Sequence, residues 1–389
     1  MKDGGNEMLA DLFKGINSSL DDELKNAEAG EGTIRDNMDD LCDILEDEIL
    51  KSKTSEEEKK ELLKQLRNFC NTETNIMLVG ATGCGKSSTI NALFAVTEQD
   101  KEVTKDAEEE LDENNPVPKK KYVEVAKVGS KADPETKDIE KYRIGNLVLW
   151  DTPGLGDGTE IDEHHKQVIT ELLREKDDDG KALIDLVLVI MDGSTRDLGT
   201  SYKILNEVII PELRNDTNRI LIALNQADIA MKTGRHWNYE KNVPDDSLVH
   251  FLEEKVQSIK TRIKEDANLD IAPVYYCAGY EEEGGDVVRP YNLSKLLYYI
   301  MQSLPAQKRV AIMEGINTDS DNYEHNDDEG DYNEGIKNSF YDSFDYIGYG
   351  VDNGTEIGGR LLGIPGAFVG AFLGGFVGCV RSILDEIFQ

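Results

Sequence analysis

The spacing of apolar positions at the start of the chain is helical. Between residues 1 and 72 they recur every three or four places, as at Ile34, Met38, Leu41 and Leu45. A stripe of this kind gives a helix one face that packs against another helix. We therefore predict an acidic helical region over residues 1–72.

From Asn75 onward the pattern changes to short apolar runs separated by helical stretches. This alternation is typical of a mostly parallel sheet covered by helices. Residues 137–143 and 147–150, joined by the turn Gly145-Asn146, predict an antiparallel hairpin at the sheet edge. The fold class we expect is α/β, with one domain over residues 73–313. The predicted strands are 76–79, 147–150, 186–191, 220–224 and 274–276.

Two charged segments interrupt or follow this domain. Residues 98–113 carry nine acidic and two basic side chains, which predicts a solvated insertion over 98–121 because such a composition cannot bury a core. Residues 314–356 carry thirteen acidic residues and one basic residue, so we expect an acidic linker.

The segment 357–389 differs from both. Residues 361–380 contain no charged side chain, a length that can cross a hydrocarbon layer. Four glycines, Gly366, Gly370, Gly374 and Gly378, recur every four residues and would lie on one helical face. Three alternatives stay open for this C-terminal helical segment: packing against another helix or a second copy, membrane contact, and disorder.

The composition of the chain excludes several classes of partner and site. With 78 acidic and 43 basic residues, the formal charge is −35, which repels nucleic acid, so we expect no nucleic-acid partner. The five cysteines form no C-x-x-C pair and predict neither a zinc site nor a disulfide framework. The first residues lack the pattern of a secretory signal. These features favour a cytoplasmic protein, with membrane association as the open alternative.

A glycine-rich loop follows the first predicted strand. Gly80-Ala81-Thr82-Gly83-Cys84-Gly85-Lys86-Ser87 has the P-loop spacing and leads through Ser88 into a helical stretch. Backbone amides and a helix N-terminus at such a loop cradle phosphates. Lys86 would contact the β- and γ-phosphates, and Ser87 would bind magnesium.

Two further motifs follow apolar strands. Asp151-Thr152-Pro153-Gly154 offers a carboxylate for magnesium and the Gly154 amide for a γ-phosphate. Asn225-Gln226-Ala227-Asp228 places an acceptor-only carboxylate where guanine, unlike adenine, presents two donors. Together with the loop, these motifs predict binding of GTP with Mg²⁺.

The order of these motifs resembles the Era-like GTPases of the translation-factor-related P-loop class over about residues 75–305. Residues 80–94 are also similar to the P-loops of immunity-related GTPases and septins. Residues 225–228, 234–237 and 289–293 look most like a bacterial, often prophage-linked subfamily named for ribosome binding. We do not infer ribosome binding from that name.

The resemblance implies two further elements of the site. Thr136 matches the switch threonine that completes the magnesium shell only in the GTP state. Cys277 and Ala278, in Cys277-Ala278-Gly279, match the turn whose backbone amides face the guanine oxygen.

Two positions depart from the family pattern. Gln226 replaces the usual lysine and so removes a cation. Leu155 stands where Ras-like enzymes carry a water-orienting glutamine. Our hypothesis is slow hydrolysis in the monomer, accelerated by self-association into a homodimer or oligomer. Arg196, His164 and His165 are candidates to act in cis or in trans, although the simpler interpretation of each, as a surface residue of a helix near the switch, is the favoured one.

Three classes of function remain in competition. The first is a GTP-hydrolysing switch in which the helices at both ends of the chain move with the nucleotide state. The second is a nucleotide-dependent assembly or membrane-inserting protein in which hydrolysis only resets the state. The third is an ATP-using P-loop enzyme, which requires that Asp228 does not face the base.

Overall fold

The structure, a computed structural model, describes residues 43, 46, 50–51, 55–96, 101–102, 139–156, 159–177, 180–196, 198–214, 216–281, 287–353, 384–385 and 387–388. The chain divides into two compact units. The larger unit comprises residues 74–304 and 315–333, and the smaller unit comprises residues 1–73, 305–314 and 334–389.

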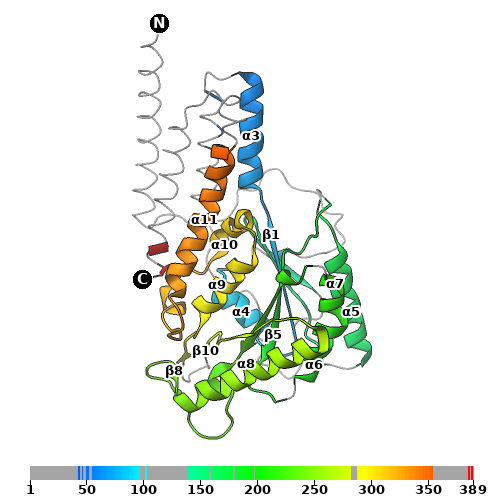
Figure 1. The fold of residues 1–389 in the computed structure, drawn as a ribbon, viewed down its shortest axis with the longest axis vertical. Helices are drawn as coiled ribbons and strands as arrows, with labels where there is room; N and C mark the ends of the chain where they lie inside the picture. The colour runs from blue at the N-terminus through cyan, green and yellow to red at the C-terminus, as the bar shows by residue number, and fades with distance from the viewer. Residues whose placement is uncertain are drawn as a thin grey trace, which may run out of the picture. The chain divides into compact units, whose positions relative to one another are not determined.

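A seven-stranded sheet forms the centre of the larger unit, with the order β2-β3-β4-β1-β5-β6-β9 (Figure 1). Strands β4, β1, β5, β6 and β9 are parallel to one another, whereas β3 is antiparallel to both β4 and β2. The central strands are continuous apolar runs because both faces of the sheet are covered. The sheet strands are β1 (Thr74–Gly80), β2 (Lys101–Glu102), β3 (Glu140–Ile144), β4 (Leu147–Asp151), β5 (Leu186–Asp192), β6 (Ile220–Asn225) and β9 (Val274–Tyr275).

Helices lie on both sides of this sheet, with α4 and α9 on one side and α5 to α8 on the other (Figure 1). The helices of the larger unit are α4 (Lys86–Leu93), α5 (Thr159–Arg174), α6 (Gly199–Ile204), the π-helix η2 (Leu205–Ile209), α7 (Ile210–Leu213), α8 (Asp246–Ala267) and α9 (Leu293–Ser303). Short 3-10 helices are η3 (Thr217–Arg219), η4 (Ala227–Ile229) and η5 (Ser320–Asn322). Two small hairpins pair β7 (Trp237–Asn238) with β8 (Val243–Pro244) and β10 (Tyr280–Glu281) with β11 (Val287–Val288).

Successive side chains along each strand point to opposite faces of the sheet and pack into the hydrophobic core on that face. Met77 and Val79 of β1 join a buried cluster with Ile169 of α5 and Leu205 of η2. The intervening residues of β1 face the opposite side of the sheet. The predicted α/β class and mostly parallel sheet are confirmed, including the antiparallel hairpin of β3 and β4.

Residues 315–333, which we call the belt, differ from the predicted linker. They belong to the larger unit, and Tyr323 is only 1% exposed. The last carbonyls of α4 accept hydrogen bonds from belt side chains, and such carbonyls have no partner within their own helix. The donors are Asn317 to Asn91 (3.1 Å), Asn322 to Ala92 (3.3 Å) and Tyr323 to Leu93 (3.3 Å).

The smaller unit contains α3 (Glu56–Cys70), α10 (Ala306–Gly315) and α11 (Tyr332–Asn353). Helix α3 agrees with the helical prediction for the N-terminal region, of which residues 1–42 lie outside the described residues. The second half of the acidic linker predicted over residues 314–356 also differs from the prediction, because it forms helix α11. The predicted domain boundary at residue 313 shifts as well, since residues 305–314 group with the smaller unit.

Three expectations about the remaining chain meet different outcomes. Cys70 is disulfide-bonded, against the expectation from cysteine spacing, and its partner lies outside the described residues. The insertion 98–121, apart from β2, and the segment 361–380 also lie outside them. Among the helices that are described, none is long and apolar enough to cross a membrane.

Candidate nucleotide-binding site

The glycine-rich loop joins the end of β1 to the start of α4. Gly83 and Gly85 have φ angles of 77° and 93°, in the left-handed region that glycine adopts without steric cost. Such residues turn neighbouring backbone amides toward one side of a loop. Helix α4 then begins at Lys86, so its free first-turn amides add to the same concave surface.

The absence of a side chain at two of these glycines is required by packing. A Cβ on Gly85 would overlap the side-chain amide of Asn225, and one on Gly80 would overlap the Ile190 carbonyl and the Cys84 sulfur. The loop is therefore held tightly between β5 and the Asn225 turn.

Ser87 and Asp151 meet beside the loop. The Ser87 hydroxyl donates to Asp151 Oδ2 at 2.8 Å, and Asp151 is 1% exposed at the end of β4. Parallel pairing brings them together, because Leu78 of β1 lies in register with Asp151. A hydroxyl and a carboxylate are the hard oxygen ligands that Mg²⁺ prefers, so these two residues fit a magnesium ion.

The turn after Asp151 is bonded directly to the P-loop. Thr82 N donates to the Leu155 carbonyl at 3.0 Å, and Leu155 N donates to the Gly80 carbonyl at 3.3 Å. The Leu155 side chain is 2% exposed and lies in the core beside α5 and β5. Its position agrees with the expectation that this leucine does not orient water.

Asn225 connects three parts of the site. Its side-chain Nδ2 donates to the Cys84 carbonyl at 3.0 Å, and its Oδ1 accepts from the Ala278 amide at 3.0 Å. The next residue, Gln226, has a left-handed φ of 61°, and its side chain donates to the Gly83 carbonyl at 2.9 Å. The amide of Gln226 thus binds the P-loop without the positive charge of the usual lysine.

We predict a measurable role for the Gln226 contact. Gln226→Met keeps the length but removes the donor to Gly83, so the Kd for GDP should rise by about 2- to 12-fold, or about 0.5–1.5 kcal/mol. Gln226→Lys retains a donor and adds a cation near the phosphates, so it should bind GDP at least as tightly as the wild type. Isothermal titration measures both. Equal affinity of the Met variant and the wild type would rule out a contribution from this hydrogen bond.

Asp228 is 7% exposed and lies two residues after Gln226, in the 3-10 helix η4. Its Oδ2 is buried and has no hydrogen-bond partner among the residues that the structure describes. Burial raises the pKa of Asp228, and hydrogen bonds from the Cys277 thiol and nearby backbone amides offset part of this rise. A buried carboxylate oxygen that lacks a donor is costly unless a ligand supplies one.

The loop of Cys277 and Ala278 lies beside Asp228, but its amides differ from the prediction. Cys277 N donates to the Tyr291 carbonyl and Ala278 N to Asn225, so both are used within the protein. Within the part of the chain that the structure describes, Gly279 N has only the Cys277 sulfur as its acceptor, at 3.4 Å. Burial raises the pKa of the Cys84 and Cys277 thiols, as expected for lining residues that are not nucleophiles.

A buried hydroxyl pair also joins the loop helix to the sheet. Thr89 Oγ1 lies 2.6 Å from the Tyr276 hydroxyl and donates to the Gly85 carbonyl at 2.7 Å. Both residues are fully buried. Sequence reasoning missed this contact because nothing in either local pattern relates two residues so far apart in the chain.

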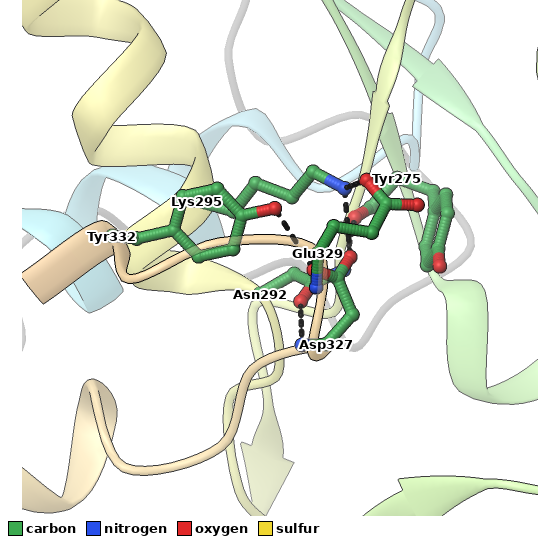
Figure 2. Close-up of polar contacts among 6 residues, drawn as sticks. All are labelled: Tyr275, Asn292, Lys295, Asp327, Glu329 and Tyr332. Carbon is green, nitrogen blue, oxygen red and sulfur yellow. Dashed lines mark hydrogen bonds and ion pairs between the residues drawn. The ribbon is translucent and has the colours of Figure 1, made fainter. Parts of the chain in front are cut away.

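A second missed feature is the cluster that fastens the belt to the base side of the site (Figure 2). Asn292 donates to the Tyr275 carbonyl at 3.1 Å and to Asp327 at 3.0 Å. Lys295 reaches Asp327 at 2.7 Å and Glu329 at 2.6 Å, and its side chain is 8% exposed. The belt is thus attached beside the strand that leads to Cys277.

The structure brings most predicted site residues together. It places residues 80–88, 151, 154, 225, 226, 228, 277 and 278 around one end of the sheet. Thr136 lies outside the described residues, so its assignment stays a prediction. His164 and Arg196 are exposed, whereas His165 is buried. No group of three or more His, Cys, Asp or Glu side chains suited to a metal occurs in the part of the chain that is described.

The fold and the site define a P-loop GTPase domain. The protein family described as "50S ribosome-binding GTPase" matches residues 75–226 of this chain. That range begins in β1 and ends at Gln226, so it includes the P-loop and the Asp151 turn. A search of curated proteins found no match.

Solved structures include several similar chains. Era from Aquifex aeolicus bound to GDP·AlF4⁻ is 16% identical, with a TM-score of 0.32, over 60% of this chain and 57% of that one. Toc33 from Arabidopsis thaliana in complex with Mg²⁺ and GMPPNP is 14% identical, with a TM-score of 0.37, over 67% of this chain and 94% of that one. A chain from an oligomerised bacterial dynamin pair is 14% identical, with a TM-score of 0.38, over 87% of this chain and 48% of that one.

Proposed function

We propose that the chain binds GTP with Mg²⁺, hydrolyses it to GDP and phosphate, and acts as a nucleotide-controlled switch of the Era-like type. The observation that carries the proposal is the buried Asp228 oxygen without a partner among the described residues. Guanine offers an N1–H and an exocyclic amine, whereas adenine has an acceptor at N1. The carboxylate therefore selects guanine over adenine.

The phosphates would lie on the amides of residues 80–88, with Lys86 beside the β- and γ-phosphates. Ser87 and Asp151 would hold the magnesium ion, joined by Thr136 in the GTP state. The ion supplies neutralisation of charge on the phosphate oxygens. In place of Cys277 and Ala278, Gly279 is the amide that would meet the guanine oxygen, because among the described residues its acceptor is a sulfur atom.

Efficient hydrolysis requires a water-orienting group that Leu155 cannot supply. We propose that self-association supplies it, with Arg196 as the candidate. Arg196 is exposed on the loop after β5, and Lys255 of α8 anchors that loop by donating to the Gly193 and Thr195 carbonyls. Membrane contact through residues 361–380 is the alternative output, in which hydrolysis only resets the state.

The test combines nucleotide binding with turnover. The wild type should bind GDP and GTP but not ADP, and Lys86→Ala should lose GTP cleavage. Turnover per molecule should rise over a hundredfold range of protein concentration, and the protein should elute as a larger species with a non-hydrolysable GTP analogue. Equal binding of ADP would exclude guanine selection. Turnover that does not depend on concentration would exclude activation by self-association.

Removing residues 357–389 separates the two outputs. A truncated chain that keeps GTP turnover but no longer sediments with vesicles or oligomers would favour the assembly or membrane role. A truncated chain that still forms the larger species would place self-association in the GTPase domain.

A further inference from the structure

Two neighbouring histidines follow the Asp151 turn, and the structure separates their environments. His164 and His165 lie on α5, with ring centroids 6.2 Å apart. His164 is exposed, whereas His165 is only 5% exposed. A buried ring cannot reach the site of a second copy, so a role for His165 must lie within its own chain.

His165 contacts the backbone of the turn. Its ring Nδ1 lies 3.0 Å from the Gly154 carbonyl oxygen. A carbonyl only accepts hydrogen bonds, so Nδ1 must carry the hydrogen. The other side of the same peptide group, Leu155 N–H, donates to the Gly80 carbonyl at 3.3 Å. The Gly154–Leu155 peptide is therefore held at both ends, by His165 and by the P-loop.

Gly154 itself is packed against the P-loop. A Cβ added to Gly154 would lie 2.6 Å from Thr82 Cα and 2.8 Å from Thr82 N, both too close for any side chain. Gly154 thus has the P-loop on one side and the His165 ring on its carbonyl. Since Gly154 carries the amide expected to sense the γ-phosphate, its orientation governs the geometry of that contact.

Helix α5, which carries His165, is itself anchored. Lys166 is 8% exposed and donates to Glu163 at 2.9 Å and to Glu207 of η2 at 2.6 Å. At the preceding turn, Gly156 N donates to Asp162 at 2.8 Å. These bonds fix the position of α5 relative to the turn, so the hydrogen bond of His165 acts from a fixed support.

We infer that His165 is a positioning residue for GTP hydrolysis, acting through the Gly154–Leu155 peptide rather than on the nucleotide. The inference rests on the proposed function. His165 holds the turn in the orientation that presents the Gly154 amide to the γ-phosphate. Without this hydrogen bond, the Gly154–Leu155 peptide is held at one end only. Rotation about the Gly154 backbone then lets the turn sample orientations in which the Gly154 N–H, which belongs to the preceding peptide, points away from the γ-phosphate.

The test compares His165→Phe with the control Gln167→Phe, because Gln167 is an exposed residue of the same helix. His165→Phe fills the same volume but has no donor, so kcat for GTP should fall about tenfold or more, with KM changed less than twofold. The preference for a non-hydrolysable GTP analogue over GDP should fall as well, because only the analogue engages the turn. His165→Asn, which places an amide donor near the Nδ1 position, should recover most of kcat.

Each outcome decides the question. Unchanged kcat and unchanged analogue preference in His165→Phe would overturn the inference while leaving the proposed function intact. An equal loss in Gln167→Phe, or failure of His165→Asn to recover kcat, would assign the effect to a disturbance of helix α5 rather than to the hydrogen bond. Thermal denaturation of all variants identifies a loss caused by unfolding. Absence of GDP binding by the wild type would overturn the proposed function and this inference together.

Discussion

Asp228→Asn should lower the affinity for GDP at least a hundredfold, or about 3 kcal/mol. The asparagine amide would present a donor to the guanine donors in a site where the carboxylate is 7% exposed. Xanthosine diphosphate carries a carbonyl where guanine has its exocyclic amine, so the variant should bind it better than GDP. Competition against a fluorescent nucleotide measures both affinities.

Asp246→Asn is the matched control, because Asp246 is an exposed carboxylate in the first turn of α8. It should leave both affinities unchanged. An Asp228→Asn variant that still prefers GDP would show that another group reads the base.

The pH dependence of the affinity for GDP is a second test of the role of Asp228. Burial raises its pKa, so protonation begins at a higher pH than for an exposed aspartate. The ionised form accepts from guanine, and protonation removes an acceptor. The affinity of the wild type for GDP should therefore fall as the pH is lowered through the raised pKa, and GDP binding should release a proton at pH values near and below that pKa. Asp228→Asn should lose this dependence.

Lys295→Met should destabilise the larger unit by about 3–5 kcal/mol, the usual cost of leaving a buried charge without its partner. The side chains of Lys295 and Asp327 are 8% and 10% exposed. Asp327 also accepts from Asn292 at 3.0 Å and from the Tyr332 hydroxyl at 2.9 Å, so it cannot turn toward water without losing these bonds. Chemical denaturation in the presence and absence of GDP measures the effect.

The pKa of Lys295 sets the pH range for this measurement. Burial opposes its charge, but the hydrogen bonds that Lys295 donates to Asp327 and Glu329 outweigh burial and raise the pKa of Lys295. A raised pKa in the folded state means that the contribution is complete below the unfolded value of about 10.4 and is lost as the pH rises through the folded value. The effect should therefore be full at neutral pH.

Lys260→Met is the control for Lys295→Met. Lys260 pairs with Asp270 at 2.9 Å, but the two side chains are 38% and 68% exposed. Solvent screens such a pair, so its loss should cost less than about 1 kcal/mol. Equal costs for the two variants would show that the Lys295 cluster is not the attachment that holds the belt.

Gln226 and the belt show where sequence reasoning reached its limit. The missing lysine at position 226 was visible in the sequence, but the hydrogen bond from Gln226 to Gly83 was not, because it depends on a left-handed backbone at that residue. The belt looked like a linker because its composition is acidic and polar. Its asparagines and Tyr323 instead bond to the last carbonyls of α4.

The sequence alone was enough to predict the α/β class, which the structure confirms, and to suggest the order of the phosphate, magnesium and base motifs and the carboxylate proposed to select guanine. These are local properties, since apolar periodicity defines strands and each motif lies within a few consecutive residues. Three features became visible only in the folded chain: which amides of the 277–279 turn remain available, which of His164 and His165 is buried, and the packing of the acidic belt against α4. Those outcomes depend on contacts between residues far apart in the chain, which no local pattern records.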